Sequence, residues 1–202
     1  MTTASSFATG FVLGLSLIVA IGAQNAFLLR QGLRREHVGV LVAFCAGADA
    51  LLMAAGVAGL AQLLGAQPQL ARALTLAGAA FLAAYGLRAL WRARRPGSLL
   101  AAAGGGLTRA QALVHVAGFT LLNPHVYLDT VLLLGSVGAR QPAGAQGLFV
   151  AGAASASLLW FSALGYGARA LAPLFARPRA WQGLDVLIGL TMLVLAAALL
   201  RG

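Results

Sequence analysis

Six apolar runs, each long enough to cross a bilayer as a helix, take up most of the chain. They cover about residues 7–29, 38–64, 70–91, 111–138, 147–171 and 181–200. About 20 apolar residues in helical form span the hydrocarbon core of a membrane. Because 60% of the 202 residues are hydrophobic and only 9% are charged, membrane lipid replaces water around most of the surface. We therefore predict an all-α integral membrane protein built as a six-helix bundle.

The arginines predict how the bundle is oriented. All 14 basic residues other than histidine are arginines, and most lie at the ends of the apolar runs. Cytoplasmic loops carry an excess of positive charge. If the runs alternate in direction, one side of the membrane receives Arg30, Arg34, Arg35, Arg88, Arg92, Arg94, Arg95, Arg109, Arg169, Arg177 and Arg179, and the other receives Arg72, Arg140 and Arg201. This pattern places the arginine-rich connections in the cytoplasm and both termini outside.

The longest connection divides the chain into two halves. Residues 92–110 contain an Arg-Arg-Pro-Gly sequence and three consecutive glycines, which do not hold a continuous helix. We predict a first three-helix repeat at residues 1–91, a cytoplasmic linker at 92–110, and a second three-helix repeat at 111–202. Short collinear matches between the halves, such as Gly78 with Gly189, support this repeat. An odd number of helices per half inverts the second repeat, an arrangement common in secondary transporters.

The first and fourth runs are interrupted by polar residues at comparable places. The interruptions are Gly22-Ala23-Gln24-Asn25 in the first run and Asn123-Pro124-His125 in the fourth. Glycine weakens a helical turn, and proline lacks an N–H and clashes with the preceding turn. We therefore predict that helices 1 and 4 are broken and that the released backbone groups face a cavity or a ligand. Gln24, Asn25 and Asn123 are candidate substrate-binding residues there.

Two of the four acidic residues, Asp49 and Asp129, lie inside apolar runs. A charge at the centre of a bilayer costs at least ~2.5–3.5 kcal/mol, so such a residue usually faces a protein-lined cavity and has a function. His125 and Asp129 are four residues apart, which places them on one helix face, where they could share a proton or a cationic ligand. The alternative is a buried ion pair to Arg30 or to another arginine that only fixes helix packing. We expect Asp185, near Arg177 and Arg179, to form an ion pair at the membrane interface.

Several other classes of function fit the sequence less well. The net charge of +10 is not arranged as a basic stripe with interleaved aromatics, so we expect no nucleic-acid partner. Three histidines and the single Cys45 provide few ligands for a metal, and the serines of the fifth run lack a nearby base for intramembrane catalysis. We attribute those serines to contacts between helices. We expect no enzyme activity, metal or cofactor.

Two segments together resemble the LysE family of bacterial amino-acid exporters. These are the stretch from Ile21 to Gly32, IGAQNAFLLRQG, and the stretch from Leu122 to Thr130, LNPHVYLDT. The resemblance runs over the whole chain, and the Gln-Asn pair is similar to the branch that exports lysine and arginine. It implies a plasma-membrane bundle in bacteria that moves L-arginine or L-lysine outward with the proton gradient. By matching position, it supports Gln24, Asn25, Asp49, Asn123, Pro124 and Asp129 as functional residues.

A cationic cargo also fits the physics of the two acids. Moving a positive charge out of a cell costs about 2.3 kcal/mol per 100 mV of membrane potential, and an entering proton cancels this term. We hypothesise that Asp49 and Asp129 alternate between binding a proton and binding the substrate cation. Export of a neutral amino acid or a divalent metal is the alternative function. An intramembrane enzyme is a third possibility that the sequence favours less. The choice between arginine and lysine, the proton stoichiometry, the role of His125 in proton transfer and the formation of a homodimer are left open.

Overall fold

The computed structural model describes residues 3–19, 22–60, 68–94, 106–123, 126–142, 144–171, 173 and 178–201. Within these residues the secondary structure is entirely helical, apart from turns and short links. The elements are α1 (Thr3–Ile18), α2 (Ala23–Arg34), α3 (Val38–Ala55), the π-helical turn η1 (Gly56–Leu60), α5 (Pro68–Ala93), α7 (Arg109–Leu121), the π-helix η2 (Tyr127–Leu134), α9 (Gly135–Ala139), α10 (Gln146–Gly167), the 3-10 turn η3 (Ala168–Leu171) and α11 (Pro178–Arg201).

Three of these helical segments are long and apolar enough to cross a membrane by themselves. They are Val38–Gly59, Gln146–Leu171 and Arg179–Arg201. A bent pair, Ser5–Ile18 with Ala23–Arg34, brings the number to four if it is taken as one span. Large apolar side chains such as Leu51, Val12 and Val194 are more than half exposed, as expected for a surface that faces lipid. The fold is thus a multi-pass bundle of apolar helices.

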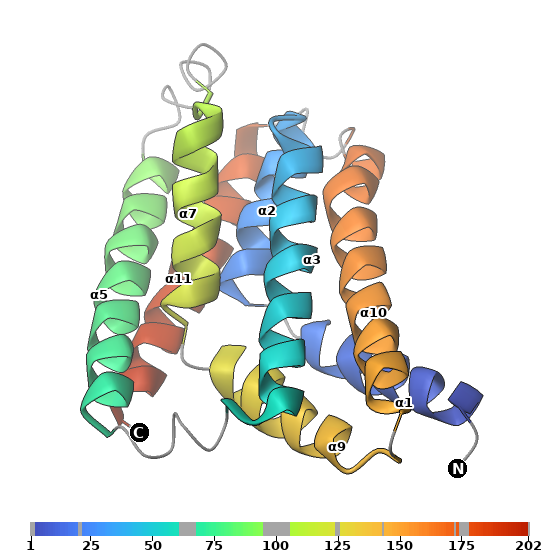
Figure 1. Ribbon diagram of the computed structural model, residues 1–202. Coiled ribbons are helices and arrows are strands. Elements are labelled where there is room, and N and C mark those ends of the chain that lie inside the picture. The colour runs from blue at the N-terminus through green and yellow to red at the C-terminus, as the bar shows by residue number, and fades with distance from the viewer. Residues whose placement is uncertain are drawn as a thin grey trace.

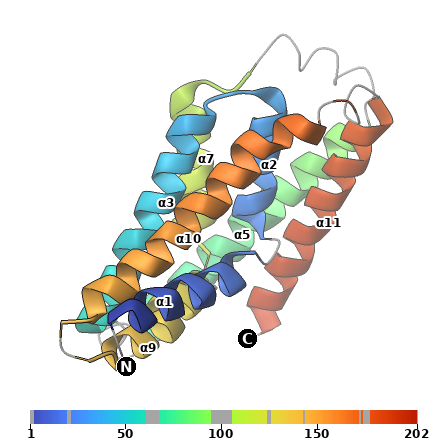
Figure 2. The same ribbon diagram turned by 90° about the vertical axis from the view of Figure 1, so that its right-hand side faces the viewer.

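The predicted first run is not a straight helix. α1 ends at Ile18, Gly22 is extended with φ −107° and ψ 179°, and α2 begins at Ala23. The two helices meet at 82°. The predicted fourth run is also interrupted, because α7 ends at Leu121 and η2 begins at Tyr127. In Figures 1 and 2, α1 and α9 lie obliquely across the lower end of the bundle, while α2 and α7 stand upright.

Local signals in the sequence explain where the upright helices begin and end. Thr108 and Gln111 form a reciprocal capping box at the start of α7, with each side chain accepting from the other residue's backbone N–H. At the end of α2, the backbone N–H of Arg35 donates to Gly32 and that of Glu36 donates to Gln31. This is the Schellman pattern, with Arg35 in the left-handed region at φ 58°.

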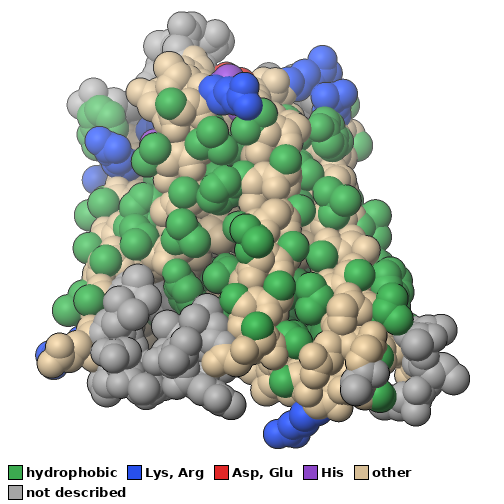
Figure 3. Space-filling model, in the orientation of Figure 1, with side chains coloured by type: hydrophobic (Ala, Val, Ile, Leu, Met, Phe, Trp, Pro, Cys, Tyr) green, Lys and Arg blue, Asp and Glu red, His purple; other side chains and the backbone are tan. Residues whose placement is uncertain are grey.

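The two ends of the bundle differ in charge. The N- and C-termini both lie at the lower end in Figure 1. On the face shown in Figure 3, hydrophobic side chains cover the flank and most of the visible arginines gather toward the upper end. We refer to this upper end, where α2 ends and α7 and α11 begin, as the arginine-rich end. The linker predicted at 92–110 reaches it, although residues 95–105 lie outside the described part of the chain.

Close helix packing depends on small residues. Gly10 of α1 faces the carbonyl group of Phe149, and Gly152 of α10 faces the carbonyl group of Phe7, so the two backbones touch reciprocally. A Cβ at either glycine would overlap the opposite carbonyl oxygen. Such contacts are typical of helices that associate in lipid. They hold the oblique α1 against α10 and thereby fix the position of the helix that precedes the break at Gly22.

This packing predicts that Gly152→Ala destabilises the protein by about 1–3 kcal/mol, the usual cost of overpacking. Gly147→Ala is the matched control, because it lies in the same helix and an added Cβ there meets nothing within 4 Å. Thermal unfolding in detergent, followed by size-exclusion of the remaining folded protein, measures the difference. Equal midpoints for the two variants would contradict a tight α1–α10 contact.

Candidate functional site

A cavity of about 260 Å³ lies where the two helix interruptions come together. Its wall combines apolar side chains with polar groups from α2, α3, η2 and the end of the α7 segment. The residues that line it are Gly14, Leu17, Ile18, Gly22, Ala23, Gln24, Asn25, Asp49, Met53, Asn123, Val126, Asp129, Thr130, Leu134 and Leu195. Two of these residues are acidic and none is basic. Within the described residues, the cavity is therefore a place for a small polar or cationic solute.

Asn25 bridges the first interruption. Its side-chain Nδ2 donates to the carbonyl oxygen of Ile18 at 2.9 Å, across the gap between α1 and α2. The Nε1 of Trp160 on α10 donates to the Asn25 Oδ1 at 3.3 Å. Helix ends leave backbone carbonyls without intrahelical partners, which is costly in a membrane. Asn25 satisfies one of them and positions the break, in addition to lining the cavity.

Gln24 differs from its neighbour. It lines the cavity, and its buried Nε2 has no oxygen or nitrogen partner among the described residues, although the Gln24 side chain lies near the sulfur of Cys45. An unpaired buried amide costs free energy unless a ligand completes its hydrogen bonds. The N-cap residue of α2, Gly22, has no side chain to cap the first backbone N–H groups. Gln24 and the start of α2 together offer hydrogen-bond donors to a carboxylate.

Asp49 and Asp129 reach the same cavity from different helices. Asp49 on α3 is 5% exposed, and its Oδ2 accepts a hydrogen bond of 2.8 Å from the Oγ of Ser157 on α10. Asp129 on η2 is partly buried. Neither carboxylate forms an ion pair with a described residue, since Arg30 binds Asp185 instead. The cavity therefore holds two carboxylates with no arginine beside them.

The second interruption contributes Asn123, which lies between the end of α7 and the start of η2 and lines the cavity. The hydroxyl group of Tyr127 donates to the carbonyl oxygen of Leu121 at 2.8 Å and so closes part of this gap. Pro124 and His125, both predicted at the site, lie outside the described residues. The other five predicted residues, Gln24, Asn25, Asn123, Asp49 and Asp129, all line the one cavity.

Sequence reasoning missed three residues here. Ser157 makes the kind of contact between helices that was expected, but its partner is the candidate site residue Asp49. Thr130 lines the cavity, and Trp160 donates to Asn25. Only Thr130 carried a signal, because it follows Asp129 directly. Ser157 and Trp160 act across helices more than a hundred residues apart in sequence, which no local pattern indicates.

The prediction for Asp185 was wrong. Asp185 is fully buried and accepts from Arg30 on α2 and Arg92 on α5, and the described Arg179 is not among its ion-pair partners. Arg177 lies outside the described residues. The reason is the packing of α11 against α5, which turns Asp185 inward toward α2. This pairing removes Arg30 as a partner for the cavity carboxylates.

The fold is a bundle of apolar helices, and two of its helices are interrupted at the wall of a cavity that carries several polar side chains. This combination is typical of a multi-pass membrane transporter. The match to known families agrees. The model of the LysE type translocator family covers residues 15–202, and the chain belongs to the LysE family. It is therefore a bacterial-type membrane transporter and not an enzyme.

Relatives cover nearly the whole chain. A protein of Mycobacterium tuberculosis strain H37Rv, named as a candidate amino-acid transporter, is 46% identical over 186 residues, which is 92% of each chain. A protein of Aeromonas salmonicida named in the same way is 44% identical over 96% of this chain and 94% of its own. The arginine exporter protein ArgO of Yersinia enterocolitica is 39% identical over 96% of both chains. No solved structure matches the chain.

The contrast between Gln24 and Asn25 gives a test of the site geometry. We expect Asn25→Leu to lower the free energy of unfolding by about 1–3 kcal/mol, because it leaves a buried carbonyl group unpaired. Gln24→Leu should lower stability much less, since its Nε2 loses at most a weak contact with the Cys45 sulfur. Thermal unfolding of both variants in detergent measures this. If Gln24→Leu proves as destabilising as Asn25→Leu, the assignment of their roles is wrong.

Proposed function

We propose that this protein exports basic L-amino acids, arginine and lysine, in exchange for protons. The observation that carries the proposal is the pair of carboxylates, Asp49 and Asp129, in one cavity without a cationic partner among the described residues. A carboxylate inside a membrane protein needs a cation or a proton. The relative named as an arginine exporter supports a cargo that supplies such a cation.

The cavity matches the groups of a basic amino acid. A free amino acid carries a carboxylate and an ammonium group on its α-carbon. Arginine and lysine carry a second positive charge at the end of the side chain. We propose that Gln24 and the start of α2 bind the substrate carboxylate, since both present hydrogen-bond donors. Asp49 and Asp129 then bind the α-ammonium group and the side-chain cation. Asn123 and Thr130 are placed to bond either the substrate or a water molecule.

Proton exchange follows from the charges. Export of one cation against a membrane potential costs about 2.3 kcal/mol per 100 mV, which an entering proton offsets. A carboxylate can hold a proton or bind a cation strongly, but not both at once. If a proton from outside must bind to the acids before they release the substrate there, export of each substrate is coupled to the entry of a proton. Ser157 donates a hydrogen bond to Asp49, and its hydroxyl group can also accept one if Asp49 is protonated.

We infer that the bundle has six crossings arranged as two inverted repeats, residues 1–91 and 111–202, joined by the linker at 92–110. The helix neighbours support this. The corresponding helices α3 and α10 pack against each other, and so do α5 and α11. α10 packs against α1 and α2, while α3 packs against the corresponding η2 and α7. In this arrangement the two broken helices cross at the cavity, near the middle of the membrane.

We propose that the arginine-rich end faces the cytoplasm of the cell and that both termini lie outside the plasma membrane. The position of both termini at the opposite end of the bundle from most visible arginines supports this orientation (Figures 1 and 3). The substrate then enters the cavity from the arginine-rich end and leaves at the end where α1 and α9 lie.

Counterflow in proteoliposomes tests the proposal. Labelled arginine, lysine, leucine and threonine are compared with and without a pH gradient, and cadmium or cobalt is added as a competitor for a metal site. We expect arginine or lysine to exchange and to be driven by the gradient. Asp49→Asn and Asp129→Asn should each lower exchange about tenfold or more, because a charge-assisted hydrogen bond contributes roughly 1.5–3 kcal/mol.

Glu36→Gln is the control variant for the two aspartates. It also removes one carboxylate, but Glu36 pairs with Arg34 at the arginine-rich end and does not line the cavity. Exchange of leucine or threonine alone would instead favour a neutral amino-acid exporter. Parental rates and pH dependence in both aspartate variants, with the protein correctly inserted, would refute the coupling mechanism.

A further inference from the structure

One buried carboxylate connects three helices near the arginine-rich end. Asp185 on α11 accepts from the guanidinium group of Arg30 on α2, and from the Nη2 of Arg92 on α5 at 3.1 Å. The side chains of Asp185 and Arg30 are 1% and 8% exposed. We call these three residues the Asp185 network. It attaches the α5–α11 pair to the second part of the broken first helix.

The Asp185 network is incompletely hydrogen-bonded. Both guanidinium groups bind the same oxygen, Oδ1, while the Oδ2 of Asp185 and the Nε of Arg92 are buried without described partners. Two positive charges also share one negative charge. Buried ion pairs gain little over apolar packing even when all their groups are satisfied, and partly satisfied networks are worse. Stability alone therefore does not explain why three charged residues occupy this place.

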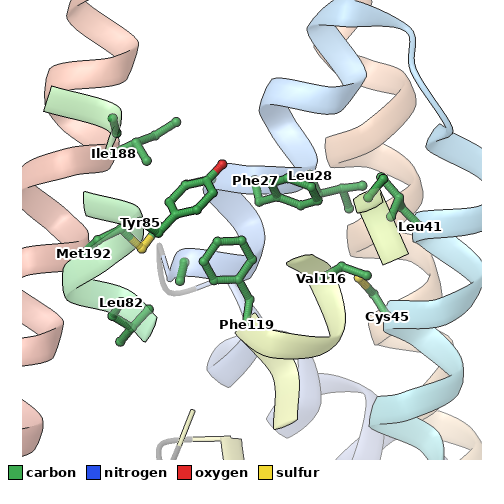
Figure 4. Close-up of a cluster of buried hydrophobic side chains, with 14 of the residues drawn as sticks. Phe27, Leu28, Leu41, Cys45, Leu82, Tyr85, Val116, Phe119, Ile188 and Met192 are labelled. Carbon is green, nitrogen blue, oxygen red and sulfur yellow. The ribbon is translucent and has the colours of Figure 1, made fainter. Parts of the chain in front are cut away.

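The position of the network suggests what it does. Along α2, Arg30 lies beyond the cavity residue Asn25, toward the arginine-rich end. Between them, Phe27 packs with Phe119 of α7, and Phe119 packs with Tyr85 of α5, with ring centroids 5.4 and 4.7 Å apart (Figure 4). These aromatic side chains fill the space between three helices. Ions and aromatics thus form two successive layers between the cavity and the arginine-rich end.

We propose that the Asp185 network is a gate that holds the arginine-rich end closed and must break before the cavity can open there. This inference rests on the proposed transport function, because only alternating access requires such an opening. Breaking the network exposes its charges to water at that end, which compensates the lost contacts. Closure and opening are then close in free energy, as a transporter that cycles between two states requires.

Thiol labelling from one side of the membrane tests the gate. In a Cys45→Ala background, Thr130→Cys places a single thiol in the cavity, and Arg109→Cys in a parallel protein marks the arginine-rich end. A membrane-impermeant maleimide is applied to vesicles on the side where the Arg109→Cys thiol reacts. With an intact network we expect slow labelling of the cavity thiol. In Arg30→Gln/Asp185→Asn it should become at least about fivefold faster, as the open state gains population.

Two further variants complete the test. Arg92→Gln keeps the Arg30–Asp185 pair and removes only the contact from the partly exposed Arg92. It should therefore accelerate labelling of the cavity thiol less than the double variant does. If the double variant does not fold, the labelling rate of Arg92→Gln tests the gate instead. Glu36→Gln breaks the Arg34–Glu36 pair, which joins residues of the α2 end rather than separate helices, and should leave labelling unchanged.

Labelling does not depend on the cargo. Failure of arginine exchange would refute the proposed substrate without changing the labelling result. Unchanged labelling rates in every folded network variant, while arginine exchange persists in the parent, would overturn the gate alone. Equal acceleration in Glu36→Gln would also overturn it, because a general loosening of this end would then explain the effect.

Discussion

Backbone groups released by a broken helix have to be satisfied inside a membrane, and this requirement shapes the centre of the protein. Two helices are interrupted, at Gly22 and beyond Leu121, and residues of both interruptions line the same cavity. Side chains close part of each gap, through Asn25 to Ile18 and Tyr127 to Leu121. The polar groups that remain gather around one cavity, because lipid offers them no hydrogen bonds.

The acidic residues divide into two uses. Asp185 is neutralised by two arginines, and Glu36 by Arg34, so both are committed within the protein. Asp49 has a serine hydroxyl as its partner, and neither it nor Asp129 has a described cation. Burying a carboxylate in a membrane protein costs free energy at all of these positions. Only Asp49 and Asp129 are placed so that a substrate cation or a proton, which binds and leaves again, can neutralise them. Whether a carboxylate has an arginine partner within the protein therefore indicates its role, structural or substrate-binding, more clearly than its position in an apolar run does.

Sequence patterns predicted the helical class, the two interruptions and five residues that line the cavity. Glycine and isolated acids in apolar runs have direct local consequences, which is why Gly22 could be placed at a break and five residues at one cavity. That these five residues bind a substrate stays a prediction. They failed for Asp185, whose neighbours in sequence are Arg177 and Arg179 but whose partners come from α2 and α5. Ser157 and Trp160 were missed for the same reason, since their contacts depend on how helices pack. Pro124 and His125 lie outside the described residues, and their roles stay predictions.

Recognition of a cationic side chain by the two carboxylates in the cavity is the interaction on which the proposed transport depends. Isothermal titration of the purified protein with arginine and with citrulline measures it directly, because the two amino acids have nearly the same shape and differ in side-chain charge. We expect arginine to bind at least about tenfold more tightly, because a charge-assisted hydrogen bond contributes roughly 1.5–3 kcal/mol. Equal affinity for arginine and citrulline would contradict it.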